Sequence, residues 1–284
     1  MPTDTDADVI AAPPRVDCHG VSHVGRVRAN NEDHFAIVAL HRGARMLHTN
    51  LQDDTIARRL TRPPAHLFIA ADGVAGFVGG EEASRLTVST IVEYLAEAAS
   101  CCQGVDAGSE QEFVDRLSAG VERAHQHIIK SYGTKGAPAT TLTMVTLLWP
   151  RAYFVHVGDS RGYLLRRGRL RQFTADQTMG DFFVDIGKAS EEQAKKMGLY
   201  DVLSSAVGSD MLPSVGLLDL EPDDALLLCT DGLTKHVPNG RIAELLGAAP
   251  TAEAACQSLL DEALAQGGSD NVTVVVGRFP TAAT

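Results

Sequence analysis

Residues 141–159, TLTMVTLLWPRAYFVHVGD, carry the clearest fold signal in the chain. Two apolar, β-branched runs flank Pro150-Arg151, which predicts two strands joined by a tight turn. The segment GYLLRRGRLRQF (residues 162–173) predicts a second hairpin that turns at Arg167-Gly168. Consecutive hairpins produce antiparallel sheets, because parallel strands need a long crossover between them.

Further strands and helices are expected on both sides of these hairpins. Short apolar runs predict strands over residues 33–40, 66–73, 224–229 and 271–279. Helical periodicity predicts helices over residues 81–99, 110–129 and 253–265, and one short helix over 191–197 within an otherwise irregular stretch, 174–198. Because the helices do not alternate regularly with single strands, the order favours an α+β layered fold.

A single domain accounts for almost the whole chain. Residues 1–15 are rich in Asp, Thr, Ala and Pro without periodicity, which is typical of a flexible tail. Residues 16–280 then form the predicted domain, and a polar, arginine-rich stretch over 41–64 is expected to be a hairpin excursion from it. No internal repeat or interdomain linker is evident.

Composition narrows the possible functions. The 25 Lys+Arg and 36 Asp+Glu residues give a net charge of −11, which argues against nucleic acid and anionic membranes as partners. The 44 % hydrophobic and 21 % charged residues are ordinary for a globular protein. No run of about 18 apolar residues predicts a membrane span, and no secretory signal is evident. With five cysteines and no C-x-x-C spacing, the sequence predicts a cytoplasmic protein without a disulfide framework.

Four aspartates stand at the ends of predicted strands. Asp72, Asp159 and Asp231 each follow an apolar run, and Asp270 directly precedes the last strand. Each residue taken alone would be interpreted as a turn cap. Several carboxylates held together in a low-dielectric setting stay ionised only beside a cation, and an all-oxygen ligand set selects Mg²⁺ or Mn²⁺.

A second constellation precedes the strand at residues 33–40. Arg28 lies close in sequence to Glu32 and Asp33. An arginine fork binds phosphate through two hydrogen bonds, and the two acids could join a metal cluster. Taken alone, the segment would be a solvated loop with an ion pair.

Together these motifs resemble the metal-dependent protein serine/threonine phosphatases of the PP2C (PPM) type, in particular the bacterial members. The motifs occur in the order of that family from about residue 20 to residue 279: Arg28, Glu32-Asp33, Asp72-Gly73, Thr140-Thr141, Gly158-Asp159-Ser160-Arg161, Asp176, Ala206-Val207-Gly208, Thr230-Asp231-Gly232-Leu233 and Gly268-Ser269-Asp270-Asn271. A single Asp-Gly would be a weak signal, whereas the complete ordered set is highly specific.

The resemblance implies a four-layer α-β-β-α sandwich with two central antiparallel sheets and a metal centre in a cleft at one rim. It implies that Asp72 bridges two metal ions, that the Gly73 carbonyl binds the first ion, and that Asp231 and Asp270 bind the second. A third, weaker metal site of bacterial members corresponds to Asp159 with Asp231.

The other motif residues also have counterparts in the family. Glu32 and Asp33 match residues that bind the metals or hold their waters, and Arg28 matches the group that clamps the phosphate. The charged segment 174–200 matches the mobile flap beside the cleft. The implied activity is hydrolysis of phosphoserine and phosphothreonine in proteins by a water activated at a centre of two Mn²⁺ or Mg²⁺ ions. The implied partners are phosphorylated targets of a serine/threonine kinase, and a monomer is the expected state.

Four residues in three motifs depart from the family pattern: Val74-Ala75, Ala139 and Gln177. None of them is a matched metal ligand. Two alternatives remain open within the same fold, namely a phosphoprotein-binding module without turnover and the branch that dephosphorylates anti-sigma-factor antagonists. The complete carboxylate set disfavours the first alternative and Arg28 disfavours the second. A P-loop nucleotide hydrolase is excluded because G-x-x-x-x-G-K-[ST] does not occur.

Overall fold

The computed structural model describes residues 15–40, 64–74, 79–99, 110–133 and 136–281. The predicted tail up to residue 14 and the predicted excursion from 41 to 63 lie outside the described residues, as do Cys101, Cys102 and Ala75. No helix within the described ranges combines the length and the apolar character that crossing a bilayer requires.

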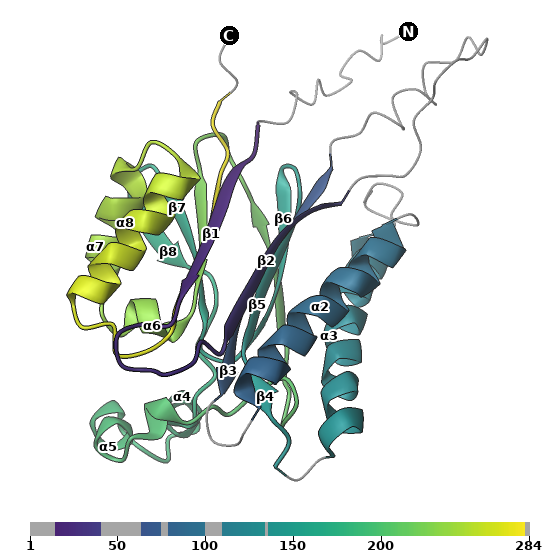
Figure 1. Ribbon diagram of the computed structural model, residues 1–284, viewed down its shortest axis with the longest axis vertical. Helices are drawn as coiled ribbons and strands as arrows, with labels where there is room; N and C mark the ends of the chain where they lie inside the picture. The colour runs from purple at the N-terminus through teal and green to yellow at the C-terminus, as the bar shows by residue number, and fades with distance from the viewer. Residues whose placement is uncertain (1–14, 41–63, 75–78, 100–109, 134–135, 282–284) are drawn as a thin grey trace, which may run out of the picture.

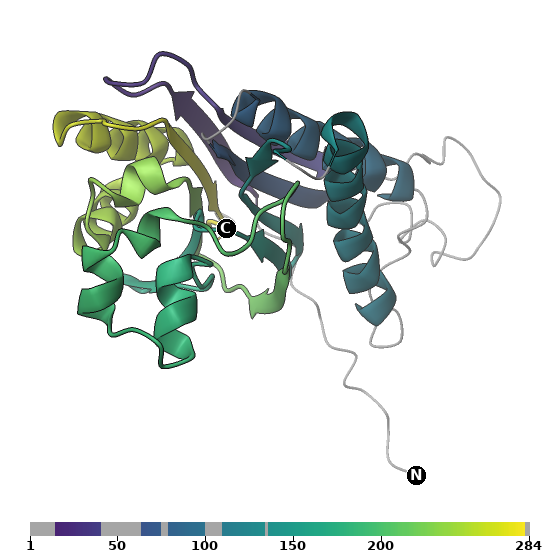
Figure 2. The ribbon, with the colours of Figure 1, turned by 90° about the horizontal axis from the view of Figure 1, so that it is seen from below.

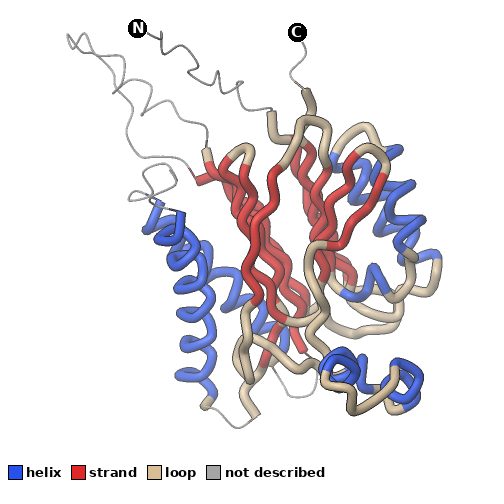
Figure 3. Tube along the Cα trace, turned by 180° about the vertical axis from the view of Figure 1, so that it is seen from behind, coloured by secondary structure: helices blue, strands red, loops and turns tan. Residues whose placement is uncertain are grey.

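Two antiparallel sheets form the centre of the molecule (Figures 1 and 3). The five-stranded sheet contains, in spatial order, β1 (Asp17–His23), β11 (Val272–Arg278), β10 (Ala225–Cys229), β7 (Arg161–Arg166) and β8 (Arg169–Gln172). The six-stranded sheet contains β2 (Asp33–Leu40), β3 (Ala65–Val74), β5 (Leu142–Leu148), β6 (Arg151–Val157) and β9 (Ser214–Asp219), with β4 (Ala139–Thr140) paired to β3. Both predicted hairpins are present, as β5–β6 and β7–β8.

Helices cover the outer face of each sheet, so the four-layer arrangement expected from the sequence is confirmed (Figure 2). The six-stranded sheet packs against α2 (Gly80–Ala99) and α3 (Glu110–Tyr132). The five-stranded sheet packs against α7 (Asn239–Ala248) and α8 (Ala252–Ala265). The short elements α4 (Met179–Asp185), α5 (Glu191–Lys196), η1 (Leu199–Asp201) and α6 (Asp231–Thr234) lie near one end of the sheets (Figure 1).

Strand β3 shows how the layers are held together. Leu67, Ile69 and Ala71 point toward α2 and α3, whereas Phe68 and Ala70 point into the interface between the two sheets. All five side chains are fully buried. A strand whose neighbouring residues face opposite sides needs apolar residues at every position when both faces are covered. This requirement explains the continuous apolar runs in the sequence.

The structure adds elements that the sequence did not predict. Strands β1 and β9 are sheet edges with few buried residues, so they lack the continuous apolar run that marks a central strand. Helix α4 lies inside the stretch 174–198 that was expected to hold only one short helix, and it begins where the Thr178 hydroxyl accepts a hydrogen bond from the Asp181 amide. The short helix predicted there is confirmed as α5, with a capping box between Ser190 and Gln193.

Candidate metal centre

Most of the predicted site residues line a small cavity at one end of the two sheets. Its volume is about 140 Å³, and seven of the eight predicted residues line it: Arg28, Glu32, Asp72, Gly73, Asp159, Asp231 and Asp270. The eighth, Asp33, lies in register opposite Asp72 on the neighbouring strand. Segments from both sheets therefore meet at this cavity.

A larger cavity of about 560 Å³ lies at the opposite end of the strands and contains none of the predicted residues. Its charged groups already neutralise one another, because Arg166 is paired with Asp224 and Glu221, and Arg167 is paired with Glu221. We therefore expect the functional site at the smaller cavity, which several acidic side chains line.

Asp33 and Asp72 form the inner part of the site. Asp33 is only 4 % exposed, and its Oδ2 accepts a hydrogen bond of 2.8 Å from the Thr230 hydroxyl. Its Oδ1 is buried without any hydrogen-bond partner. Burial raises the pKa of Asp33 to about 7, and burial together with the negative charge of Asp33 raises the pKa of Asp72 well above its ordinary value.

Asp159 lies between the two sheets, in the connection from β6 to β7, and Asp231 belongs to the five-stranded side of the cavity. Asp159 follows β6, and burial together with the charge of Asp231 raises its pKa to about 7. Asp231 begins α6 directly after β10, and its Oδ1 is a second buried oxygen without a hydrogen-bond partner. Burial raises the pKa of Asp231 as well. Four carboxylates thus share a region in which ionisation is costly.

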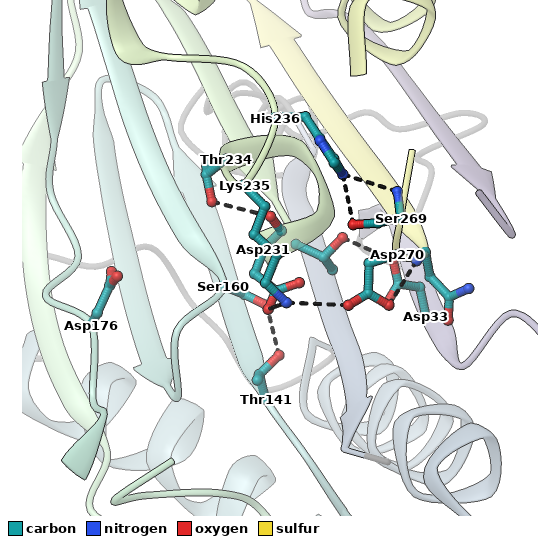
Figure 4. A network of polar contacts seen from close by, with 12 residues as sticks. Asp33, Thr141, Ser160, Asp176, Asp231, Thr234, Lys235, His236, Ser269 and Asp270 are labelled. Carbon is teal, nitrogen blue, oxygen red and sulfur yellow. Dashed lines mark hydrogen bonds and ion pairs between the residues drawn. The ribbon is translucent and has the colours of Figure 1, made fainter. Parts of the chain in front are cut away.

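Two basic side chains contact the outer pair, Asp231 and Asp270: Lys235 contacts both carboxylates (Figure 4), and Arg28 contacts Asp270. The Lys235 ammonium lies 2.5 Å from Asp231 Oδ2 and 3.1 Å from Asp270 Oδ2. Arg28 Nε lies 2.8 Å from Asp270 Oδ1. Burial opposes ionisation of Asp270, but the hydrogen bonds from Arg28 and Lys235 outweigh it and lower the pKa of that carboxyl.

Backbone contacts fix the loops that carry these side chains. Asn271 Oδ1 accepts a hydrogen bond of 2.8 Å from the Glu32 amide, and its Nδ2 donates to the carbonyls of Val24 and Asn30. Gly73 lies so close to the carbonyls of Gly80 and Glu32 that a Cβ at this position would collide with them. The hydrogen bonds of Asn271 therefore hold the loop that carries Arg28 against the start of β11. The close approach of β3 to α2 requires glycine at position 73.

Glu32 is placed differently from the aspartates. It lines the cavity, but its carboxylate lies about 3.1 Å from the point that a Cβ of Gly80 would occupy, at the first residue of α2. Burial raises the pKa of Glu32. The structure brings Glu32 to the rim of the site, beside Arg28, whose positive charge partly offsets this increase in pKa.

The donor set fits a hard divalent cation. It contains only oxygen atoms, and Asp33 Oδ1 and Asp231 Oδ1 are buried without a hydrogen-bond partner, which is costly unless a cation supplies the missing interaction. Among the described residues, no three acidic, histidine or cysteine side chains yet surround one point closely enough to hold an ion by themselves. Lys235 and Arg28 form ion pairs with the two outer carboxylates.

Sequence reasoning missed Lys235 and assigned no role to the motif residue Thr230. Lys235 follows Asp231 by four positions, a spacing that brings two side chains together on a helix and that could have indicated the ion pair. Thr230 orients Asp33 from 197 positions away, and nothing in the local sequence indicates that contact. The motif residue Asp176 lies apart from the labelled aspartates of the cluster (Figure 4). It pairs with Arg161 at 2.7 Å.

Comparison with known proteins adds an independent line of evidence. The family model described as "Protein phosphatase 2C" matches residues 42–267, a range that leaves out Arg28, Glu32, Asp33 and Asp270. The chain is 32 % identical over 256 residues to the serine/threonine protein phosphatase PstP of Mycobacterium tuberculosis, an alignment that covers 89 % of this chain. It is 27 % identical over 237 residues to the serine/threonine phosphatase stp of Listeria innocua, covering 82 % of this chain and 91 % of that relative.

A solved structure agrees with the sequence comparison. The catalytic domain of PstP in complex with two manganese ions superposes with a TM-score of 0.69 at 31 % identity, covering 94 % of this chain and 99 % of that one. The alignment with the M. tuberculosis protein covers only 43 % of that relative, so this chain spans less than half of its length.

Proposed function

Because the chain belongs to the protein phosphatase 2C family, we propose that it hydrolyses phosphoserine and phosphothreonine in proteins with a water activated at a centre of two Mn²⁺ or Mg²⁺ ions. The observation that carries the proposal is a pair of buried oxygens without hydrogen-bond partners. One belongs to Asp231, which lines the acidic cavity, and the other to Asp33, which lies in register opposite the cavity residue Asp72. The manganese-bound structure of PstP supports the choice of metal.

The roles that the family resemblance implies can be carried over to this cavity. Asp72 would bind both ions, the Gly73 carbonyl would bind the inner one, and Asp231 and Asp270 would bind the outer one. Glu32 and Asp33 would bind the metals or hold their waters. Asp159 would complete a third, weaker site. When bound, the ions supply a hydroxide near neutral pH and balance the charge that develops on the phosphoryl group.

The chain's own residues then position these groups and the substrate. The Thr230 hydroxyl donates to Asp33 Oδ2 and leaves Oδ1 free for a metal ion. The Arg28 side chain is 45 % exposed at the cavity, where its planar fork suits two phosphoryl oxygens of a phosphorylated side chain. The Asn271 side chain fixes the loop that carries Arg28, so the fork is held close to the metal ligands.

The proposal extends to partners and location. Phosphoproteins produced by a serine/threonine kinase are the expected substrates, and the chain is expected to act as a monomer in the cytoplasm. The free cysteines among the described residues, Cys18, Cys229 and Cys256, suit a reducing compartment.

The decisive experiment is hydrolysis of a phosphothreonine peptide, with a phosphotyrosine peptide beside it, in Mn²⁺ and after treatment with EDTA. We expect activity on phosphothreonine that EDTA abolishes and Mn²⁺ restores. Thiol alkylation should leave the activity unchanged, because none of the described residues that line the cavity is a cysteine. A folded sample without activity in any divalent metal would contradict the proposal and favour a phosphoprotein-binding module.

A further inference from the structure

Lys235 is a charged side chain in the cavity that none of the roles above uses. It lies at the C-terminal end of α6, and its ammonium bridges Asp231 and Asp270 across the outer part of the site. Its side chain is 43 % exposed. The long stem can therefore carry the ammonium toward solvent without disturbing the core.

The positive charge is distributed unevenly over the site. Among the described residues, Asp33, Asp72 and Asp159 form no ion pair with a basic side chain. Asp231 and Asp270, by contrast, share the Lys235 ammonium, and Asp270 also binds the Arg28 guanidinium. These three carboxylates thus lack a basic partner, whereas the outer pair, Asp231 and Asp270, already has a cation of its own.

We propose that Lys235 is a resident cation of the metal centre and competes with the outer metal ion for Asp231 and Asp270. The proposal depends on the metal-dependent phosphatase function proposed above, and it concerns the affinity of one position in that centre. An ion that binds there must displace the ammonium, so both ion pairs of Lys235 are lost and its charge remains close to the incoming ion. The outer position should consequently bind metal more weakly than the inner one, and occupancy of the outer position would limit activity at low metal concentration.

The test is a calorimetric titration of metal-free protein with Mn²⁺, which needs no turnover. Lys235→Met removes the charge while keeping most of the stem and adds no oxygen that could act as a ligand. Lys235→Arg retains the charge. Lys130→Met, at an exposed position on α3 that does not line the cavity, is the matched control for the change in net charge.

We expect two unequal binding steps in the wild type. Removing a unit charge within a few ångströms of a divalent ion should tighten the weaker step by about tenfold or more in Lys235→Met. The wild-type pattern should persist in Lys235→Arg and in Lys130→Met. In EDTA, Lys235→Met should melt at a lower temperature than the wild type, because Asp231 and Asp270 lose a shared counter-charge, and Mn²⁺ should remove that difference.

The outcomes separate this inference from the function on which it rests. Mn²⁺ binding that is unchanged in Lys235→Met would overturn the competition and leave the proposed phosphatase function intact. Weaker binding in that variant would also overturn it, since Lys235 would then support the ion rather than compete with it. Absence of Mn²⁺ binding in all four proteins would contradict both proposals.

Discussion

The guanidinium of Arg28 binds the carboxylate of Asp270 through two contacts, Nε to Oδ1 at 2.8 Å and Nη2 to Oδ2 at 3.0 Å. The two residues are 242 positions apart in the sequence. The pair joins the loop before β2 to the turn before β11. It also places the expected phosphate-binding group directly on an expected metal ligand. Binding of a metal ion at Asp270 would therefore compete with this contact and release the fork for a phosphoryl group.

Replacing Arg28 by Ala should raise KM for a phosphothreonine peptide. A charge-assisted hydrogen bond to phosphate contributes about 1.5–3 kcal/mol, which corresponds to an increase of roughly 10- to 150-fold in KM. Steady-state kinetics in saturating Mn²⁺ measures this effect. Arg167→Ala, an exposed arginine at the other end of the strands, is the control. An unaltered KM in Arg28→Ala would exclude the clamp role.

Removing either outer carboxylate should abolish turnover that depends on metal. Asp231→Ala and Asp270→Ala each delete an expected oxygen ligand, and neither residue belongs to the apolar core between the sheets, so the fold should remain intact. Phosphopeptide hydrolysis over a Mn²⁺ titration measures the loss, and circular dichroism checks the fold. Asp261→Ala, on the exposed face of α8, should retain wild-type activity. Full activity in either site variant would contradict the assignment.

Thr230 should influence metal affinity although it is not expected to be a ligand. The side chain is fully buried, donates to Asp33 Oδ2 and accepts a hydrogen bond of 2.9 Å from the Thr273 amide. Thr230→Val keeps the shape but removes both interactions, so Mn²⁺ affinity should fall by about 10- to 100-fold. Thr230→Ser retains the hydroxyl and should bind Mn²⁺ nearly as the wild type does. Equal affinity in the Val and Ser variants would show that the hydroxyl does not orient Asp33.

Because the His156 imidazole is buried in its neutral form, we expect the folded protein to lose stability in mild acid. Its side chain is fully buried, its Nε2 donates to the Ala175 carbonyl, and burial lowers its pKa to about 4. The unfolded chain takes up a proton near pH 6.5, so stability is lost as the pH falls from about 6.5 to 4, by about 3 kcal/mol.

Urea denaturation of the wild type and of His156→Asn at pH 7 and pH 4.5 measures this contribution as a difference. The comparison with the variant is needed because Asp33 and Asp159, whose pKa values are raised, change stability in the opposite direction over this pH range. The free energy of unfolding should fall more steeply in the wild type than in the variant. An equal change in the free energy of unfolding between pH 7 and pH 4.5 in the two proteins would show that His156 is not held neutral. An NMR signal of the His156 imidazole that titrates near pH 6.5 would show the same.

The central strands could be predicted because they are buried on both faces. β5, β6, β10 and β11 consist almost entirely of buried residues, and their sequences are correspondingly continuous in apolar character. Strands β1 and β9 escaped prediction because few of their side chains are fully buried and their sequences, DCHGVSH and SVGLLD, lack a continuous apolar run. An apolar sequence pattern predicts a strand only where the side chains of that strand are buried, and few side chains of β1 and β9 are buried.

The amino-acid sequence by itself determined which carboxylates lie at strand ends, the order of the family motifs and the layered fold, because these features depend on residue type and short-range periodicity. Only the tertiary structure decided that Asp33 lies opposite Asp72, that Thr230 binds Asp33, and that Lys235 and Arg28 hold the outer carboxylates. Most of these contacts join segments that lie far apart in the chain, and their distances arise from sheet register and packing. The charge balance of the site is therefore a property of the folded chain that no local segment encodes.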